Sequence, residues 1–208
     1  MKLVFLGPPG AGKGTQAERI CKEYGITHIS TGEMFRTEIA AKTELGMLAA
    51  SYIDRGELVP DECVIKMVAS KVSECSNGFL LDGFPRTLAQ AEELSKHVQL
   101  DYAVNIDVPK DRLVDRIVRR RSCHDCDAVY DVSELPDGKT CPKCGKVLTV
   151  RKDDTPEVVE ERCHVYEKKT RPIIEYYEKK GQLITVNGDQ SKDAVTDEIR
   201  AALGKARE

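Results

Sequence analysis

The chain has 208 residues, of which 40% are hydrophobic and 32% are charged, and it contains no Trp. This composition is that of an ordinary globular protein, and the length allows one core domain with insertions or two small domains. A formal net charge of −3 excludes a global attraction to nucleic acid or to an anionic membrane. Apolar runs all stay below the twenty or so residues of a membrane span.

Short apolar runs alternate with helical patterns along most of the chain. Strands are expected at 3–6, 79–81, 103–108 and 183–186. Helices are expected at 12–24, 61–75, 87–98, 110–121, 156–180 (broken or kinked near Pro172) and 191–204. Because strands that alternate with helices form parallel sheets covered on both faces, this order predicts an α/β fold with a binding crevice at the carboxyl ends of the strands.

Two segments depart from this alternation. Residues 30–59 have the pattern of a small helical excursion between the second strand and a returning helix. Residues 122–150 are rich in Cys, Asp, Gly and Lys and poor in large apolar side chains. Such a segment buries too little surface to fold unaided, so it needs a metal or covalent cross-link.

A glycine-rich loop, GPPGAGKGT at 7–15, follows the first strand and opens the first helix. This context is the one that a phosphate-binding loop (P-loop) requires, because the loop N–H groups and the helix N-terminus converge on an anion. Lys13 would reach the β and γ phosphates, and Thr15 would hold Mg²⁺ directly or through water. Gly14 occupies the place where the strict pattern has Ser or Thr. The prediction of phosphate binding therefore depends more on Lys13 and the loop backbone than on Thr15. The alternatives are a turn without a ligand and a dinucleotide fingerprint, whose G-x-G-x-x-G pattern is absent.

Two C-x-x-C pairs, Cys123 with Cys126 and Cys141 with Cys144, are separated by the fourteen residues 127–140. Each pair can bring two thiolates to one tetrahedral ion, and four thiolates leave no open position for catalysis, so the pattern favours a structural zinc. The alternatives are two disulfides, a redox C-x-x-C, an iron–sulfur site or iron in place of zinc. His124 is expected to face solvent. Four further cysteines are expected to be small core residues: Cys21, Cys63, Cys75 and Cys163.

Six motifs occur in order along the chain: GPPGAGKGTQ at 7–16, STGEMFR at 30–36, GELVPD at 56–61, FLLDGFPRT at 79–87, DRIVRRR at 115–121 and RKDD at 151–154. Together they resemble the adenylate kinases, nucleoside monophosphate kinases that convert ATP and AMP reversibly into two ADP. The insertion after Arg121 resembles the members with a long zinc-binding lid. The resemblance implies a P-loop NTPase-type five-stranded parallel sheet with helices on both faces. It also implies a core domain at 1–29, 60–119 and 154–208, a helical flap for the monophosphate at 30–59 and a zinc-stapled β lid at 120–153.

The resemblance further implies the site residues. Phosphoryl transfer depends on positioning and on neutralising negative charge, which explains the need for several cations. Asp82 would order the water shell of Mg²⁺, and Arg116 would lie over the adenine of ATP. The implied catalytic residues are Lys13, Asp82, Arg86, Arg120, Arg151 and Arg162. The implied ATP-binding residues are Gly10, Ala11, Gly12, Lys13, Gly14, Thr15, Arg116, Arg120, Val129, Tyr130 and Gln190. The implied AMP-binding residues are Thr31, Arg36, Glu57, Leu58, Val59, Gly83, Phe84, Pro85, Arg86, Gln90, Arg151 and Arg162.

The base of the acceptor nucleotide would be read by Thr31 and Gln90, since a Gln amide offers both a donor and an acceptor to adenine. This favours AMP over UMP or CMP. Thr31 also stands where an N-cap of the following helix is expected. The remaining basic residues of the arginine-rich stretch are expected to be solvated surface charges: Arg112, Arg119 and Arg121.

Two other functional classes compete with the kinase. A zinc-ribbon nucleic-acid binder would use the arginine run before Cys123, but the segment has no aromatic stacking residue other than Tyr130. A non-catalytic nucleotide sensor would bind ATP without forming ADP. For a kinase, the expected partners are ATP, AMP and ADP without nucleic acid or membrane, in a cytoplasmic monomer. The segments 30–59 and 120–153 are then expected to be mobile flaps that close over AMP and ATP and exclude water.

Overall fold

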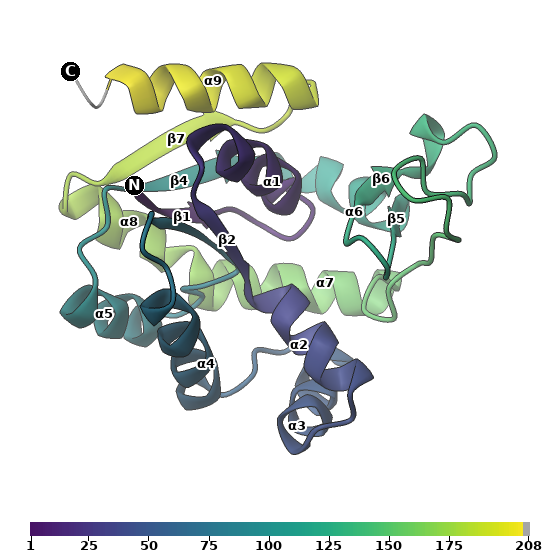
Figure 1. Cartoon of the computed structure of the whole chain (residues 1–208), viewed down its shortest axis with the longest axis horizontal. Coiled ribbons are helices and arrows are strands. Elements are labelled where there is room, and N and C mark those ends of the chain that lie inside the picture. Colours follow the sequence, from purple (N-terminus) through teal and green to yellow (C-terminus); the bar gives the residue numbers. More distant parts are fainter. Residues whose placement is uncertain (206–208) are drawn as a thin grey trace.

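The computed structural model describes residues 1–205, and a five-stranded parallel sheet lies at its centre (Figure 1). The strand order is β2-β3-β1-β4-β7, and the parallel pairing of the five strands agrees with the predicted α/β P-loop fold. The strands are β1 (Lys2–Leu6), β2 (Thr27–Ser30), β3 (Phe79–Asp82), β4 (Tyr102–Asp107) and β7 (Leu183–Asn187). Within residues 1–205, none of the helices is long and apolar enough to cross a membrane.

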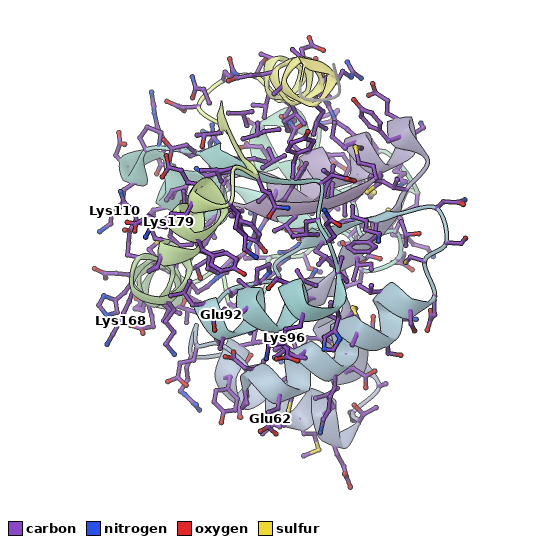
Figure 2. The ribbon with its side chains drawn as sticks, turned by 90° about the vertical axis from the view of Figure 1, so that its left-hand side faces the viewer. Glu62, Glu92, Lys96, Lys110, Lys168 and Lys179 are labelled. Atoms are coloured by element: carbon purple, nitrogen blue, oxygen red, sulfur yellow. The ribbon has the colours of Figure 1, made fainter. Side chains whose placement is uncertain are left out.

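Alternate residues of the central strand β1 enter two hydrophobic cores, one on each face of the sheet. Leu3 and Phe5 belong to one core, whereas Val4 and Leu6 belong to the other. The first core packs against α1 (Lys13–Tyr24), α6 (Lys110–Val118), α7 (Pro156–Val165) and α9 (Lys192–Lys205). The second packs against α4 (Asp61–Ser73), α5 (Leu88–His97) and α8 (Pro172–Lys179). The outer surfaces of these helices carry charged side chains that point away from the body, among them Glu92, Lys96 and Lys179 (Figure 2).

The carboxyl ends of three adjacent strands meet at one edge of the sheet. Phe5 and Ser30 both lie opposite Asp82 in the parallel register. This brings the P-loop after β1, Thr31 after β2 and Asp82 at the end of β3 to one place. β1 pairs with β3 on one side and β4 on the other, so the chain order reverses around it. A ligand crevice is expected at such a switch point.

One predicted helix is shorter in the structure, and another is broken near Pro172, as predicted. The helix predicted over 110–121 ends at Val118, because residues Arg120–Ser122 form strand β5 and pair antiparallel with β6 (Val129–Asp131). The helix predicted over 156–180 is interrupted before Pro172 by one π-helical turn, Tyr166–Thr170. Pro172 has no N–H and its ring crowds the preceding turn, and the wider turn, in which Arg171 N–H donates to Tyr166 O at 2.9 Å, accommodates this break.

The segment 30–59 is helical, as predicted, and consists of α2 (Thr31–Ala40) and α3 (Glu44–Ile53). The two helices pack closely at Gly46, where a Cβ atom would lie 2.1 Å from Glu38 O. The expectation that Thr31 caps α2 is wrong, since the Ser30 hydroxyl accepts the hydrogen bond from Glu33 N–H. Thr31 is therefore free to serve another contact.

The segment after α6 is a small β lid with a hydrophobic core of its own. This core contains only five buried residues, two of which are cysteines: Cys123, Ala128, Leu135, Cys141 and Leu148. A core of this size is too small to stabilise an independent fold, which supports the predicted need for a cross-link.

Candidate functional site

A cavity of about 760 Å³ opens where the P-loop, α2 and the lid meet. Every residue of the expected ATP set lines it. All of the expected AMP set line it as well, with the exception of Phe84 and Pro85. The Phe84 side chain is instead 2% exposed within the hydrophobic core, and Pro85 borders a separate cavity of about 80 Å³. The Phe84 side chain therefore packs in the core, because burial of an apolar ring after a buried strand is favourable, and a contact of Phe84 or Pro85 with AMP stays a prediction.

The P-loop adopts a conformation that its glycines make possible. Gly10 and Gly12 have φ values of 83° and 90°, a region that other residues rarely adopt. At Gly10 a Cβ atom would lie 2.9 Å from the Ile117 side chain of α6, so only glycine lets the loop approach this helix. α1 begins directly after the loop, at Lys13. The loop amides and the positive end of the α1 dipole therefore face one anion-binding position.

Lys13 lies at this position and is held by the loop itself. Its ammonium group donates to Gly7 O at 2.7 Å and to Pro8 O at 3.0 Å. Burial lowers the pKa of Lys13 to about 8, and the positive charges of Arg86, Arg162 and Arg120 add to this effect, against the opposing influence of Asp82. The lysine thus carries a charge that its surroundings do not fully compensate, which an incoming phosphate would stabilise.

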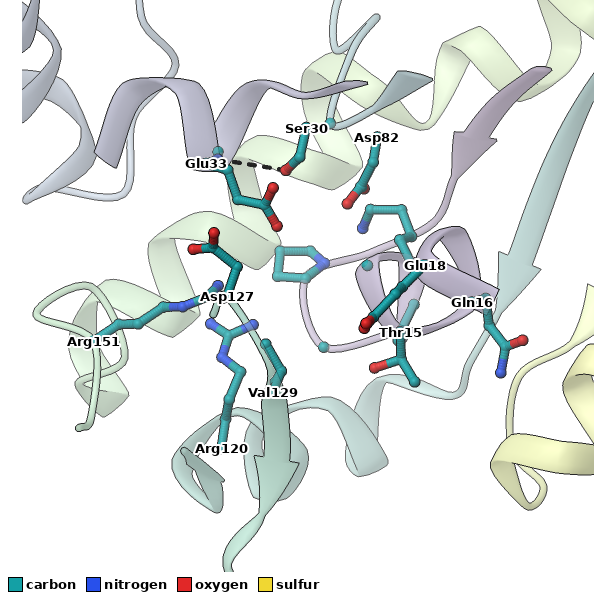
Figure 3. Close-up of a pocket in the computed structure, with 18 of the residues that line it drawn as sticks. Thr15, Gln16, Glu18, Ser30, Glu33, Asp82, Arg120, Asp127, Val129 and Arg151 are labelled. Atoms are coloured by element: carbon teal, nitrogen blue, oxygen red, sulfur yellow. Dashed lines mark hydrogen bonds between the residues drawn. The ribbon is translucent and has the colours of Figure 1, made fainter. Parts of the chain in front are cut away.

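Asp82 stands beside the first turn of α1, on the opposite side from the arginines of the lid (Figure 3). Its Oδ2 atom lies 3.7 Å from His28 Nε2, and both side chains are largely buried. Burial acts to raise the pKa of Asp82, but His28, Lys13 and Arg86 outweigh it and lower the pKa. The pKa of His28 is raised by Asp82 although burial acts to lower it. Asp82 is therefore an ionised carboxylate inside the cavity.

An acidic pair from the RKDD motif orders the arginines of the site. The Asp154 side chain is 0% exposed, and it accepts hydrogen bonds from Arg120 Nε at 2.9 Å, from a second Arg120 nitrogen and from Arg162 at 3.1 Å. Asp153 pairs with Arg162 at 2.8 Å. These carboxylates hold two guanidinium groups from distant parts of the chain in fixed positions.

Arg36, Arg86 and Arg151 complete the positive wall of the cavity. Burial lowers the pKa of all three, and for Arg151 it falls to about 9, with further contributions from the neighbouring Arg120 and Arg36. A lowered arginine pKa means that positive charges are crowded together away from water with too little negative charge nearby. The wall is therefore built to receive a polyanion.

The residues expected to read the acceptor base are already oriented by hydrogen bonds. The Thr31 hydroxyl donates to Gly83 O at 3.0 Å. The Gln90 amide donates to Asp61 at 2.7 Å and accepts from Arg86 N–H at 2.7 Å. Since an amide has two donor hydrogens and two acceptor lone pairs, Gln90 retains one donor and one acceptor for a ligand.

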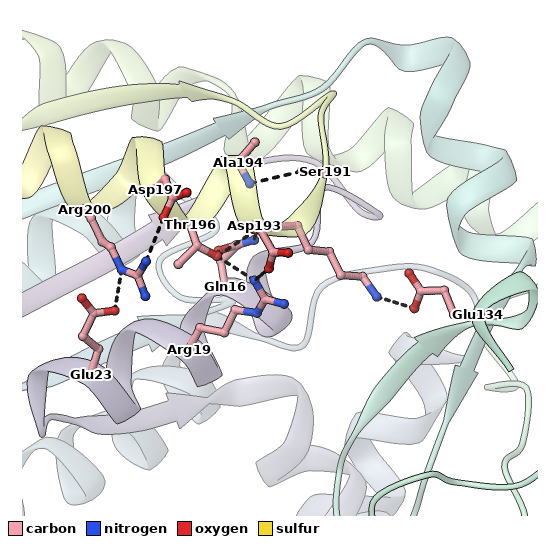
Figure 4. Close-up of polar contacts among 11 residues, drawn as sticks. Gln16, Arg19, Glu23, Glu134, Ser191, Asp193, Ala194, Thr196, Asp197 and Arg200 are labelled. Carbon is pink, nitrogen blue, oxygen red and sulfur yellow. Dashed lines mark hydrogen bonds and ion pairs between the residues drawn. The ribbon is translucent and has the colours of Figure 1, made fainter.

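Two ion pairs connect the lid to the core. The lid contributes the positive charge to one pair and the negative charge to the other. Lys143, between two cysteines of the lid, pairs with Glu18 of α1 at 3.0 Å. Glu134 of the lid pairs with Lys192 at the start of α9 (Figure 4). α9 is in turn tied to α1, because Gln16 donates to Lys192 O at 2.8 Å. The lid is thus joined to α1, the helix that begins at the end of the P-loop.

The four lid cysteines form a compact sulfur cluster. Their Sγ atoms all lie within 4.8 Å of one another, with Cys123 and Cys144 at 3.4 Å and Cys126 and Cys141 at 3.6 Å. These separations are far above the roughly 2.05 Å of a disulfide, so the disulfide alternative is wrong. A tetrahedral ion with metal–sulfur bonds of about 2.3 Å requires sulfurs about 3.8 Å apart, and these two separations lie near that value. The donor set can therefore hold a metal ion with all four thiolates.

Some contributors to the site had no role assigned from the sequence: His28, Asp153, Asp154, Glu18 and Lys143. The RKDD motif contained a usable signal for the two aspartates, because adjacent carboxylates beside an arginine suggest a charge network. The others depend on contacts between distant elements. Arg119, which does not line the cavity, pairs with Asp131 at 3.1 Å and is exposed, and His124 is exposed, as expected. Cys21 and Cys163 are buried as expected, whereas Cys63 and Cys75 are only half-buried.

Comparison with known proteins places the chain in a family. The family model described as adenylate kinase matches residues 5–182. The adenylate kinase of Carboxydothermus hydrogenoformans is 50% identical to this chain, over 99% of the chain and 100% of that relative. The adenylate kinases of Archaeoglobus fulgidus and Desulforudis audaxviator are each 49% identical, over 100% and 99% of this chain and the full length of both relatives. The chain therefore belongs to the adenylate kinase family.

Proposed function

We propose that this protein transfers the terminal phosphoryl group of ATP to AMP and forms two ADP reversibly. The observation that carries the proposal is the continuous cavity that joins the P-loop to the Thr31 and Gln90 side, walled by cations of lowered pKa. A single nucleotide at the P-loop would leave the wall of Arg36, Arg86 and Arg151 uncompensated. Two nucleotides placed end to end would supply phosphates both to the P-loop and to this arginine wall.

The ATP would occupy the P-loop side of the cavity and the AMP the side of α2. Lys13 would give up its contacts to the loop carbonyls and bind the β and γ phosphates, while Arg36 and Arg86 would bind the AMP phosphate. Arg120, Arg151 and Arg162 would surround the transferring group, where negative charge is greatest. The chemistry needs no general base with a tuned pKa, because positioning and charge neutralisation supply most of the rate.

Mg²⁺ would enter with ATP and neutralise part of its phosphate charge. Asp82 would orient water molecules of that ion; its lowered pKa and its position beside the first turn of α1 support this role. Thr15 also lines this part of the cavity. Zinc fits the four cysteines best, because tetrahedral thiolate sites prefer it, and its role would be to hold the lid together.

The remaining features of the proposal rest on membership of the family. We expect a monomeric, cytoplasmic enzyme that binds ATP, AMP and ADP and not nucleic acid. Residues 30–59 and 120–153 would be flaps that close on the core residues 1–29, 60–119 and 154–208. Gel filtration with light scattering at several protein concentrations tests the monomer.

A coupled assay that offers ATP with AMP, UMP, CMP or GMP in turn tests the reaction. ADP formation is expected with AMP and only weakly with the other monophosphates. No ADP formation with AMP would refute the proposed function, and ATP binding without turnover would indicate a sensor. Lys22 of α1 is exposed and supplies a matched control: Lys13→Met should abolish turnover, whereas Lys22→Met should leave it unchanged.

A further inference from the structure

Asp189, in the turn between β7 and α9, contacts two arginines of α6. Its Oδ1 lies 3.3 Å from Arg116 NH2, and its Oδ2 lies 3.5 Å from Arg112 Nε. Arg112 and Arg116 are four residues apart and therefore lie on the same face of the helix. Of the two arginines, only Arg116 lines the nucleotide cavity, while Arg112 is 62% exposed.

The turn that carries Asp189 is itself firmly held. Gly188 N–H donates to Asp107 O of β4 at 2.7 Å, and Asp189 N–H donates to the Asn187 side chain at 2.9 Å. In addition to its contact with Asp189, Arg116 donates a hydrogen bond from NH1 to Gly188 O at 3.0 Å. The guanidinium of Arg116 thus has two of its nitrogens bound to neighbouring residues of one ordered turn.

The direction of these bonds determines what Arg116 can still do. The N–H groups of a guanidinium point outward in its plane, so bonds to Gly188 O and Asp189 occupy the edge and leave both flat faces unbonded. A flat face is the surface on which an aromatic base stacks. The carboxylate also compensates the charge of Arg116, which separates this arginine from the cations that face the phosphates.

We propose that Asp189 is a positioning residue for ATP, which holds the Arg116 guanidinium by its edge so that its face receives the adenine ring. The inference rests on the proposed function, in which Arg116 contacts the adenine of ATP. Arg112 shares the carboxylate from the solvent side and does not line the cavity.

The direct test is ATP affinity, measured by titration calorimetry on the full-length protein. Asp189→Ala should weaken ATP binding about 3- to 10-fold, because a long ion pair at a partly exposed site contributes less than a buried one. AMP affinity and the melting temperature should stay at wild-type values. Asp189→Asn keeps one acceptor oxygen and should show a smaller loss. Asp193→Ala removes an equal charge from the start of α9 and should leave ATP affinity unchanged.

A double-mutant cycle separates positioning from a general effect. In an Arg116→Ala background, Asp189→Ala should cause no further loss of ATP affinity. An unchanged loss in that background, or an equal loss of AMP affinity, would overturn the proposal. An Arg116→Ala variant that binds ATP normally would overturn it too, while leaving the phosphoryl transfer reaction intact. Absence of ADP formation by the wild-type protein would instead refute the proposed function, and the calorimetric cycle would still report on Asp189.

Discussion

Asp154 provides the most direct test of how the site is held together. Its fully buried carboxylate is shared by Arg120 and Arg162, whose side chains are 15% and 19% exposed. Asp154→Asn keeps the shape of the side chain but removes its charge and presents an amide N–H₂ group to the arginines. Both guanidinium groups then lose their common counter-charge inside the protein.

Loss of one partner from a buried ion pair costs about 3–5 kcal/mol in free energy of unfolding. Both arginines border the open cavity, where water can solvate them, so the cost should be near the lower limit, about 3 kcal/mol. For a protein of this size, such a loss lowers the melting temperature by roughly 6–12 °C. Turnover should fall about 100-fold, because an arginine displaced by about 1 Å no longer meets the transferring group.

Thermal unfolding by circular dichroism and the coupled ADP assay measure the two effects. Phosphates would replace the missing negative charge, so saturating nucleotides should narrow the difference in melting temperature between the variant and the wild type. Asp125→Asn, a change at an exposed position of the lid, is the matched control. Wild-type stability together with kcat within threefold of wild type would refute the assigned role of Asp154.

Three further predictions address the charge of Lys13, the metal site and the lid. Lys13→Met should raise the melting temperature of the nucleotide-free protein. Because the pKa of Lys13 is about 8 when folded and near 10.5 when unfolded, the unfolded chain binds more protons between these values. The contribution of Lys13 to stability thus increases with pH over this window, and the advantage of the variant should shrink between pH 7 and 9.5; thermal scans showing a pH-independent difference would contradict this. Removal of the metal by a chelator should lower the melting temperature, and so should Cys144→Ala. Cys75→Ala, a change outside the cluster, should have little effect. If elemental analysis confirms that the metal is lost and the melting temperature is unchanged, the metal is not structural. Glu18→Lys or Lys143→Glu should raise the KM for ATP by up to about fivefold at low salt, which corresponds to the free energy of an exposed ion pair. The double variant, in which the two charges are exchanged, should restore the wild-type KM. A KM that stays raised in the double variant would show that the pair does not assist lid closure.

Several features could be predicted from local sequence because their physical causes are local. The P-loop needs only glycines, a lysine, a preceding strand and a following helix, all within 3–24. The two C-x-x-C pairs identify a metal site because each pair places two sulfurs together by itself. Strand alternation with helices is sufficient to predict a parallel sheet with a crevice at its carboxyl edge. The sulfur cluster and the cavity in the structure agree with these predictions.

Tertiary structure decided which side chains share a charge and which enter the core. Asp189 contacts Arg116 across 73 residues of sequence, and Asp82 meets His28 across parallel strands. Phe84 belongs to a motif of the site, yet it enters the core because burial of an apolar ring outweighs exposure to the cavity. Hydrophobic periodicity reports only which face of an element is buried. Hydrogen bonds and ion pairs between distant elements depend on how those elements pack. This packing determines where each arginine side chain of the site is held.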